Sequence, residues 1–148
     1  LLMLKRLVSP RVLTSVWKLR WNGWITGRRF QNRATTHCQF RCSDTADDSI
    51  GHYVRCPIIR EFARRQMNLR NLNPEHFFLA VDHMNGNDLT CIALLAYSVF
   101  ASLIALAAST DQLPREEYVQ LLSARLKFAL EGHSHSAKIL LTRCVQAA

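Results

Sequence analysis

Hydrophobic and polar positions follow a helical period along most of this chain. The clearest case begins at Ser9-Pro10, where an N-cap residue precedes a proline in the first helical position. Val12, Val16 and Leu19 then fall on one face of the segment. This spacing predicts a helix over residues 10–20.

Three tryptophans lie at and beyond the end of this helix. Asn22-Gly23, between Trp21 and Trp24, breaks the helical pattern. We interpret Trp17, Trp21 and Trp24 as core anchors, because large aromatic side chains contribute strongly to burial. Stacking on nucleic-acid bases is the alternative role for such residues.

Four further helices are expected downstream. One begins at Cys56-Pro57 and a short one at Asn73-Pro74; both place a proline where a helix tolerates it. Another follows the acidic stretch from Asp111 and ends before Gly132. The last follows a loop at residues 133–136.

Residues 89–109 form a run of twenty-one positions without a charge, LTCIALLAYSVFASLIALAAS. About 20 apolar residues suffice to cross a membrane. This run is rich in Ala and Ser, however, and its flanks are Asp88 and Asp111, with no Lys/Arg bias to orient it. A helix that is apolar on all sides is also typical of a bundle centre. We favour a buried helix, with a membrane-spanning helix as the alternative.

Charge is distributed unevenly along the chain. The net charge is +8, but residues 1–70 contain fourteen Lys/Arg and four Asp/Glu, whereas residues 71–148 contain five and seven. The first acidic residue is Asp44. This asymmetry suggests that the first half faces a polyanion, with a solvated basic surface as the alternative. An acid-free, Arg-rich beginning is also typical of organellar targeting, so a mitochondrial or plastid setting is one expectation.

The chain has five cysteines, and this odd number argues against a complete disulfide framework and favours a reducing, intracellular compartment. Cys91 and Cys144 lie in apolar helical patterns, where we expect buried thiols. The other three lie within nineteen residues, together with a histidine. Their spacing is Cys38-x3-Cys42-x9-His52-x3-Cys56.

This spacing predicts a structural zinc site. Zn²⁺ commonly takes three Cys and one His in a tetrahedron, with ligand pairs a few residues apart. Four protein ligands leave no position open for water, so a catalytic zinc is not expected, and no deaminase-type Glu accompanies the ligands. His37, which adjoins Cys38, is an alternative ligand, and a coincidental Cys/His cluster is the other alternative.

The residues around this cluster resemble a known family. The runs Cys38–Cys42, Asp48–Tyr53 and Cys56–Phe62 look like the zinc-binding region at the carboxyl end of non-LTR (LINE-type) retrotransposon reverse transcriptases. The specific part of the resemblance is residues 37–62. It implies zinc ligation by the three cysteines and the histidine, and nucleic-acid contact by the basic residues around them. The first pair is Cys-x3-Cys where Cys-x2-Cys is commoner, and nothing resembles a polymerase palm or an endonuclease.

The predicted fold is therefore mainly α, with a small zinc-knuckle module followed by a helical, bundle-like C-terminal half. We divide it into a basic N-terminal helix and arm at residues 1–36, the zinc-binding module with its following helix at 37–66, and a helical region at 67–148.

Arginine dominates the basic residues near the cluster, and its guanidinium group suits bidentate contacts with phosphate. The candidates for nucleic-acid contact are Arg28, Arg29, Arg33, Arg41, Arg55, Arg60, Arg64 and Arg65.

The function expected from the sequence is a non-catalytic, zinc-stabilised nucleic-acid-binding module, with RNA favoured and DNA left open. The alternative is a structural subunit recruited into a large organellar assembly, such as a ribosome or a membrane complex. In that case helix 89–109 would pack against neighbouring proteins or lie in a membrane. An enzyme is not expected, because no nucleophile–base pair or open metal site is visible.

Overall fold

The computed structural model describes residues 3–27, 37–70, 73–78, 84–109 and 112–145. Helices dominate these residues, and within them no β-strand forms beyond one isolated backbone bridge between His37 and Asp47. This confirms the predicted mainly α class. One hydrophobic core takes residues from the N-terminal helices, from the Cys/His segment (residues 37–56) and from the C-terminal helices.

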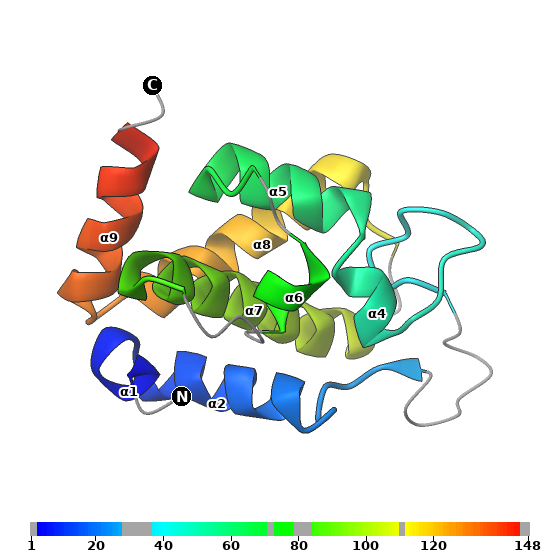
Figure 1. Cartoon of the computed structure of the whole chain (residues 1–148). Coiled ribbons are helices and arrows are strands. Elements are labelled where there is room, and N and C mark those ends of the chain that lie inside the picture. The colour runs from blue at the N-terminus through cyan, green and yellow to red at the C-terminus, as the bar shows by residue number, and fades with distance from the viewer. Residues whose placement is uncertain (1–2, 28–36, 71–72, 79–83, 110–111, 146–148) are drawn as a thin grey trace.

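The N-terminal layer consists of α1 (Leu4–Leu7) and α2 (Pro10–Arg20), which confirms the helix expected at residues 10–20. Ser9 has extended backbone angles at the N-cap, and Pro10 occupies the first turn. The inner face of α2 carries Val12, Val16 and Leu19, all of them buried. Figure 1 shows α2 lying along α7 (Gly86–Ala107).

The tryptophan prediction is right for one residue and wrong for two. Trp24 is fully buried, its ring contacts Phe77 and Phe100, and its Nε1 donates to the Ser15 carbonyl oxygen at 3.2 Å. Trp17 and Trp21, however, are 45% and 78% exposed. At about 100° per residue they lie roughly 140° and 180° around α2 from Val12, so they point away from the core.

The middle of the chain contains α4 (Ile50–Tyr53), α5 (Pro57–Met67) and the short α6 (Pro74–Phe77). The helix starts expected at the two prolines are confirmed. Asn68 ends α5 in the left-handed conformation, with φ 50°, and the Leu69 N–H then donates to the Ala63 carbonyl oxygen at 3.0 Å. This turn is a C-cap, in which carbonyls at the end of the helix regain hydrogen bonds.

The centre of the molecule is α7, against which the other long helices pack. It begins at Asn85, whose side chain accepts a hydrogen bond from the Asp88 N–H. Its most apolar eighteen-residue window is 78% buried inside the protein. The run 89–109 is thus a core helix here, which is the arrangement favoured by its composition.

Two helices complete the fold, α8 (Arg115–Leu130) and α9 (Ser134–Val145). Gly132 joins them with a φ of 71°, a conformation that side chains with a Cβ rarely adopt. The expected loop at 133–136 is too long, because α9 begins at Ser134. The Nδ1 of His133 lies 2.9 Å from the Ser136 hydroxyl, so the loop histidine is part of the helix start.

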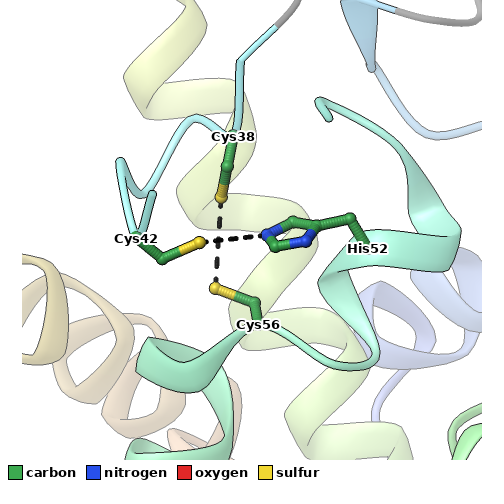
Figure 2. Close-up of side chains that lie close together, drawn as sticks. All are labelled: Cys38, Cys42, His52 and Cys56. Atoms are coloured by element: carbon green, nitrogen blue, oxygen red, sulfur yellow. Dashed lines mark hydrogen bonds between the residues drawn. The ribbon is translucent and has the colours of Figure 1, made fainter. Parts of the chain in front are cut away.

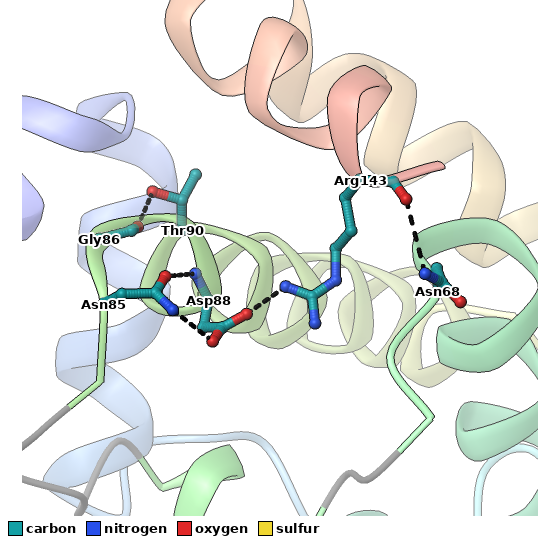
Figure 3. Close-up of polar contacts among 6 residues, drawn as sticks. All are labelled: Asn68, Asn85, Gly86, Asp88, Thr90 and Arg143. Atoms are coloured by element: carbon teal, nitrogen blue, oxygen red, sulfur yellow. Dashed lines mark hydrogen bonds and ion pairs between the residues drawn. The ribbon is translucent and has the colours of Figure 1, made fainter. Parts of the chain in front are cut away.

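Polar contacts attach α9 to the start of α7 (Figure 3). Arg143 pairs with Asp88, and its carbonyl oxygen accepts from the Asn68 side chain at 3.5 Å. Burial alone lowers the pKa of Arg143, but the hydrogen bond and charge of Asp88 outweigh burial and raise that pKa. The beginning of α7, the turn after α5 and α9 are thereby held together.

Candidate metal centre

The two cysteines of the first pair come from one tight turn. The Arg41 N–H donates to the Cys38 carbonyl oxygen at 2.8 Å, and Arg41 itself has a φ of 45°. This turn brings the Cys38 and Cys42 side chains to the same side of the chain (Figure 2). The Cys-x3-Cys spacing is therefore compatible with a chelating pair.

The other two residues of the cluster lie on α4 and at the N-cap of α5. His52 lies on α4, whose N-cap Ser49 accepts from the His52 N–H at 3.2 Å. Cys56 is the N-cap of α5, and Pro57 follows it in the first turn. These short helices fix the backbone of both residues.

The four side chains converge on one point, as Figure 2 shows. Their ligand atoms all lie within 4.8 Å of one another, with Cys38 Sγ 4.0 Å from Cys56 Sγ and Cys42 Sγ 3.1 Å from His52 Nε2. Zn–S and Zn–N bonds of about 2.3 and 2.0 Å, at tetrahedral angles, would place these atoms about 3.8 and 3.5 Å apart. A disulfide would need sulfurs about 2.05 Å apart, so the cysteines are not arranged for one.

The electrostatics of the cluster also fit a cation. The hydrogen bond to Cys56, burial and the Cys56 charge raise the pKa of the Cys38 thiol far above its ordinary value. Burial and the neighbouring Cys38 raise the pKa of Cys42 to about 11. Burial lowers the pKa of His52, which favours the neutral, metal-binding imidazole. Thiolates this close together would need a positive ion between them, and a bound metal deprotonates a coordinating thiol. The predicted residues could therefore hold a metal ion.

A buried carboxylate lies beside the cluster and was not singled out by sequence reasoning. Asp48 is 2% exposed; its Oδ2 accepts from the Gly27 N–H at 2.5 Å and from Gln39 Nε2 at 3.2 Å, and its Oδ1 accepts from the Tyr53 hydroxyl. Burial and this carboxylate raise the pKa of Tyr53, so the phenol remains a donor. These contacts join the turn at Gln39, α4 and the chain that follows α2.

Aromatic contacts tie the same region to the helical body. The Phe40 ring is fully buried and lies edge-on to Tyr53 at 5.8 Å and to Tyr118 of α8 at 5.9 Å between centroids. Such edge-to-face pairs contribute about 0.5–1.5 kcal/mol each beyond the area they bury. The Cys/His segment is therefore packed onto α8 as well as being folded around its own cluster.

His37, the alternative ligand, is not one of the four converging residues; its backbone pairs with Asp47.

The thiol predictions differ in outcome. Cys91 is fully buried, whereas Cys144 is only partly buried, and its Sγ lies 3.6 Å from the Gln66 carbonyl oxygen. Cys144 lies near the end of α9.

The predicted arginines divide into two groups. Arg28, Arg29 and Arg33 lie outside the described residues. The other five have exposed side chains on the Cys/His segment and on α5, and they are Arg41, Arg55, Arg60, Arg64 and Arg65.

One acidic residue neutralises part of this basic surface. Glu61 pairs with Arg65 and with Arg115 of α8, each at 3.0 Å. The hydrogen bond from Arg115 lowers the pKa of Glu61, which keeps the carboxylate charged. Across the described residues, no ion pair involves Arg60 or Arg64, so their charges stay uncompensated by direct pairing.

Arg60 and Arg64 border a hollow that sequence reasoning missed. It has a volume of about 150 Å³ and is also lined by Glu61, Leu69 and Arg70. The Nε of Arg70 donates to Asn68 Oδ1 at 3.1 Å, which orients its guanidinium group. The αL turn after α5 brings Arg70 back beside the helix, and the sequence offered no signal for this reversal beyond Asn68 itself.

A larger hollow of about 610 Å³ lies at the N-terminal end of α7. Its charged lining residues are Asp88 and Arg143, which pair with each other (Figure 3). It therefore offers no free charge to a ligand.

Comparisons with protein-family models, with curated proteins and with solved structures found no match. The cluster of Cys38, Cys42, His52 and Cys56 therefore stands on its own geometry and donor chemistry.

Proposed function

We propose that the protein is a non-catalytic, zinc-stabilised module that binds nucleic acid, RNA in the first place, through the arginines beside its metal centre. Three thiolates and one imidazole are the donor set that zinc favours in closed structural sites. Such a site supplies folding energy and rigidity, and its ligands leave no room for a reacting water.

The observation that carries this proposal is the direct succession of a metal ligand and a basic helix. Cys56 is both a member of the cluster and the N-cap of α5, and Arg60 and Arg64 lie one and two turns later on that helix. A metal held by Cys56 therefore fixes the position of the arginines. Arginine placed on a rigid element contacts phosphate without losing much side-chain freedom.

The hollow beside α5 supports phosphate as the group that is bound. Arg60, Arg64 and Arg70 surround it, and the nearby Glu61 carboxylate already pairs with Arg65 and Arg115. Like charges four residues apart on a helix repel each other, so an anion between them would relieve this repulsion. A phosphate backbone supplies such anions without requiring a particular base sequence.

The resemblance of residues 37–62 to the retrotransposon zinc region supports the same ligands and the same kind of partner. We also propose that this chain derives from a retrotransposon of this kind. The alternative role, as a subunit of a large organellar assembly, is an outcome of the experiment that follows.

The experiment measures affinity for labelled RNA and DNA at several salt concentrations. We expect log affinity to fall linearly with log salt, because bound phosphates release counterions. Arg60→Gln with Arg64→Gln should weaken binding for all base sequences and reduce the salt slope by about 1 for each phosphate that is no longer neutralised. The matched control, Lys127→Gln with Lys138→Gln, makes the same charge change at exposed positions on α8 and α9.

Equal losses in the two double variants would show that net charge, and not the α5 surface, decides binding. No measurable binding at low salt would overturn the proposal and favour the assembly role. Metal analysis completes the test, since a purified chain with fewer than about one zinc per molecule would contradict the zinc assignment.

A further inference from the structure

Two tryptophans on the outer face of α2 are exposed for no reason that the fold provides. Trp17 is 45% exposed and Trp21 78% exposed, whereas Trp24, which follows at the end of the same segment, is fully buried. Exposed large apolar side chains that occur as a group mark interaction sites more often than chance. Trp17 lies on α2 and Trp21 is its C-cap, four residues later, so the two are neighbours at the end of the helix.

The charge around these rings is positive. α2 also exposes Arg11, Lys18 and Arg20, and the described residues 3–27 contain no acidic side chain. The Arg11 guanidinium lies 4.3 Å from the centre of the Phe128 ring, and Lys18 Nζ lies 4.9 Å from that of Phe100. These contacts hold the two cations on the sides of α2, while the tryptophans lie on its outer face. A partner for this face must therefore tolerate aromatic contact and carry negative charge.

We infer that Trp17 and Trp21 form a stacking platform for the bases of single-stranded nucleic acid, with Lys18 and Arg20 facing its backbone. This inference rests on the proposed function and adds base contacts to the phosphate contacts of α5. Each base has a flat π-face, so aromatic stacking accepts any base, and it is the usual companion of basic residues in single-strand binding.

The helical rise between Trp17 and Trp21 favours a single strand over a duplex. Four residues advance α2 by about 6 Å, nearly twice the step of about 3.4 Å between stacked nucleotides. Bases that lie on both rings must therefore be unstacked from each other. A flexible single strand allows this separation, whereas a duplex keeps its bases paired and inside.

The chain that follows the platform leads to the metal centre. Figure 1 shows the C-terminal end of α2 on the side of the molecule that holds α4. The Gly27 N–H, a few residues after Trp21, donates to Asp48 beside the cluster. Exposed Arg55 then lies between α4 and α5.

The test compares an oligo(U) and an oligo(dT) with a duplex of the same length, using the zinc-loaded full chain. Trp17→Ala and Trp21→Ala should each weaken single-strand binding by about fivefold to 150-fold, which corresponds to the loss of one stacked base. Duplex affinity and the salt slope should stay unchanged. Trp17→Phe and Trp21→Phe should restore most of the affinity, because phenylalanine also stacks.

Leu141→Ala is the matched control, since Leu141 is an apolar side chain on α9 that is 65% exposed. Binding should also quench tryptophan fluorescence in the wild type, and much less in the Trp17→Phe/Trp21→Phe variant, whose remaining Trp24 is buried. Thermal unfolding of each variant shows whether a loss of binding reflects a loss of folding.

Three results would overturn the inference. If the wild type binds both probes with a steep salt dependence but the tryptophan variants bind as tightly as it does, the proposed function stands and the platform does not. If the wild type binds neither the single strands nor the duplex, the proposed function and the stacking platform are both wrong. If the alanine variants abolish self-association of the protein and leave oligonucleotide binding intact, the face is a protein contact.

Discussion

The buried carboxylate of Asp48 provides the sharpest test of how the Cys/His segment is held. We expect Asp48→Asn to destabilise the zinc-loaded protein by about 2 kcal/mol. Asp48 accepts hydrogen bonds from Gly27, Gln39 and Tyr53 while it is 2% exposed. A hydrogen bond to a charged group contributes about 1.5–3 kcal/mol, and a neutral one about 0.5–1.5.

The magnitude follows from what an amide can replace. Its oxygen can still accept from Gly27 and Gln39, but each bond loses the charge, at a cost of about 1 kcal/mol. Its NH2 group would face the Tyr53 hydroxyl, which must turn to accept. The desolvation cost of the carboxylate disappears at the same time, so the full sum of three charged bonds is an upper limit.

The assay is thermal and denaturant unfolding at neutral pH with metal content measured in each sample. For a chain of this size, 2 kcal/mol corresponds to a fall in Tm of about 4–8 °C. Asp44→Asn is the control, because it makes the same change at an exposed position in the same segment. A double-mutant cycle with Tyr53→Phe should give a coupling energy above about 0.5 kcal/mol.

If Asp48→Asn changes stability by less than about 0.5 kcal/mol, or no more than Asp44→Asn does, the carboxylate does not hold the segment together. The hydrogen bonds from Gly27 and Gln39 to Asp48 would then contribute little to stability. The packing of Phe40 would have to account for the contact between the Cys/His segment and α8.

Other changes test the metal centre and the core. Cys56→Ser should lose zinc and lower Tm, whereas Cys91→Ser should keep the full zinc content, as metal analysis would show. Burial raises the pKa of Cys91 to about 11, so the folded protein binds more protons than the unfolded chain between about pH 8.5 and 11, and stability should fall with rising pH in that window. Mass spectrometry after brief alkylation should find Cys144 modified before Cys91. Trp24→Ala should cost about 3–5 kcal/mol in denaturant unfolding, whereas Trp17→Ala should cost less than about 0.5.

The convergence of Cys38, Cys42, His52 and Cys56 could be predicted because its signal is local. Cys38 and Cys42 are joined by one turn, and His52 and Cys56 by another, so short spacings carry most of the geometry. The helix starts at Pro10 and Pro57 were predictable for a similar reason, since proline and its preceding N-cap act within one turn.

The residues that sequence reasoning misplaced depend on which face of a helix meets the rest of the chain. Val12, Val16 and Leu19 defined the inner face of α2, and the same period already placed Trp17 and Trp21 opposite it. The angular position of a side chain around α2, and not its size, therefore decides whether it is buried. Arg70 and Asp48 could not be placed from the pattern, because both depend on turns whose partners lie elsewhere in the chain.

Cys56 belongs to the cluster and is also the N-cap of α5. Under the proposed function this shared residue makes the two kinds of binding thermodynamically linked. If bound zinc raises the affinity for nucleic acid by some factor, bound nucleic acid must raise the affinity for zinc by the same factor. Zinc would then dissociate most readily from protein that has no nucleic acid bound. The concentration of free zinc would set the fraction of the protein that can bind nucleic acid.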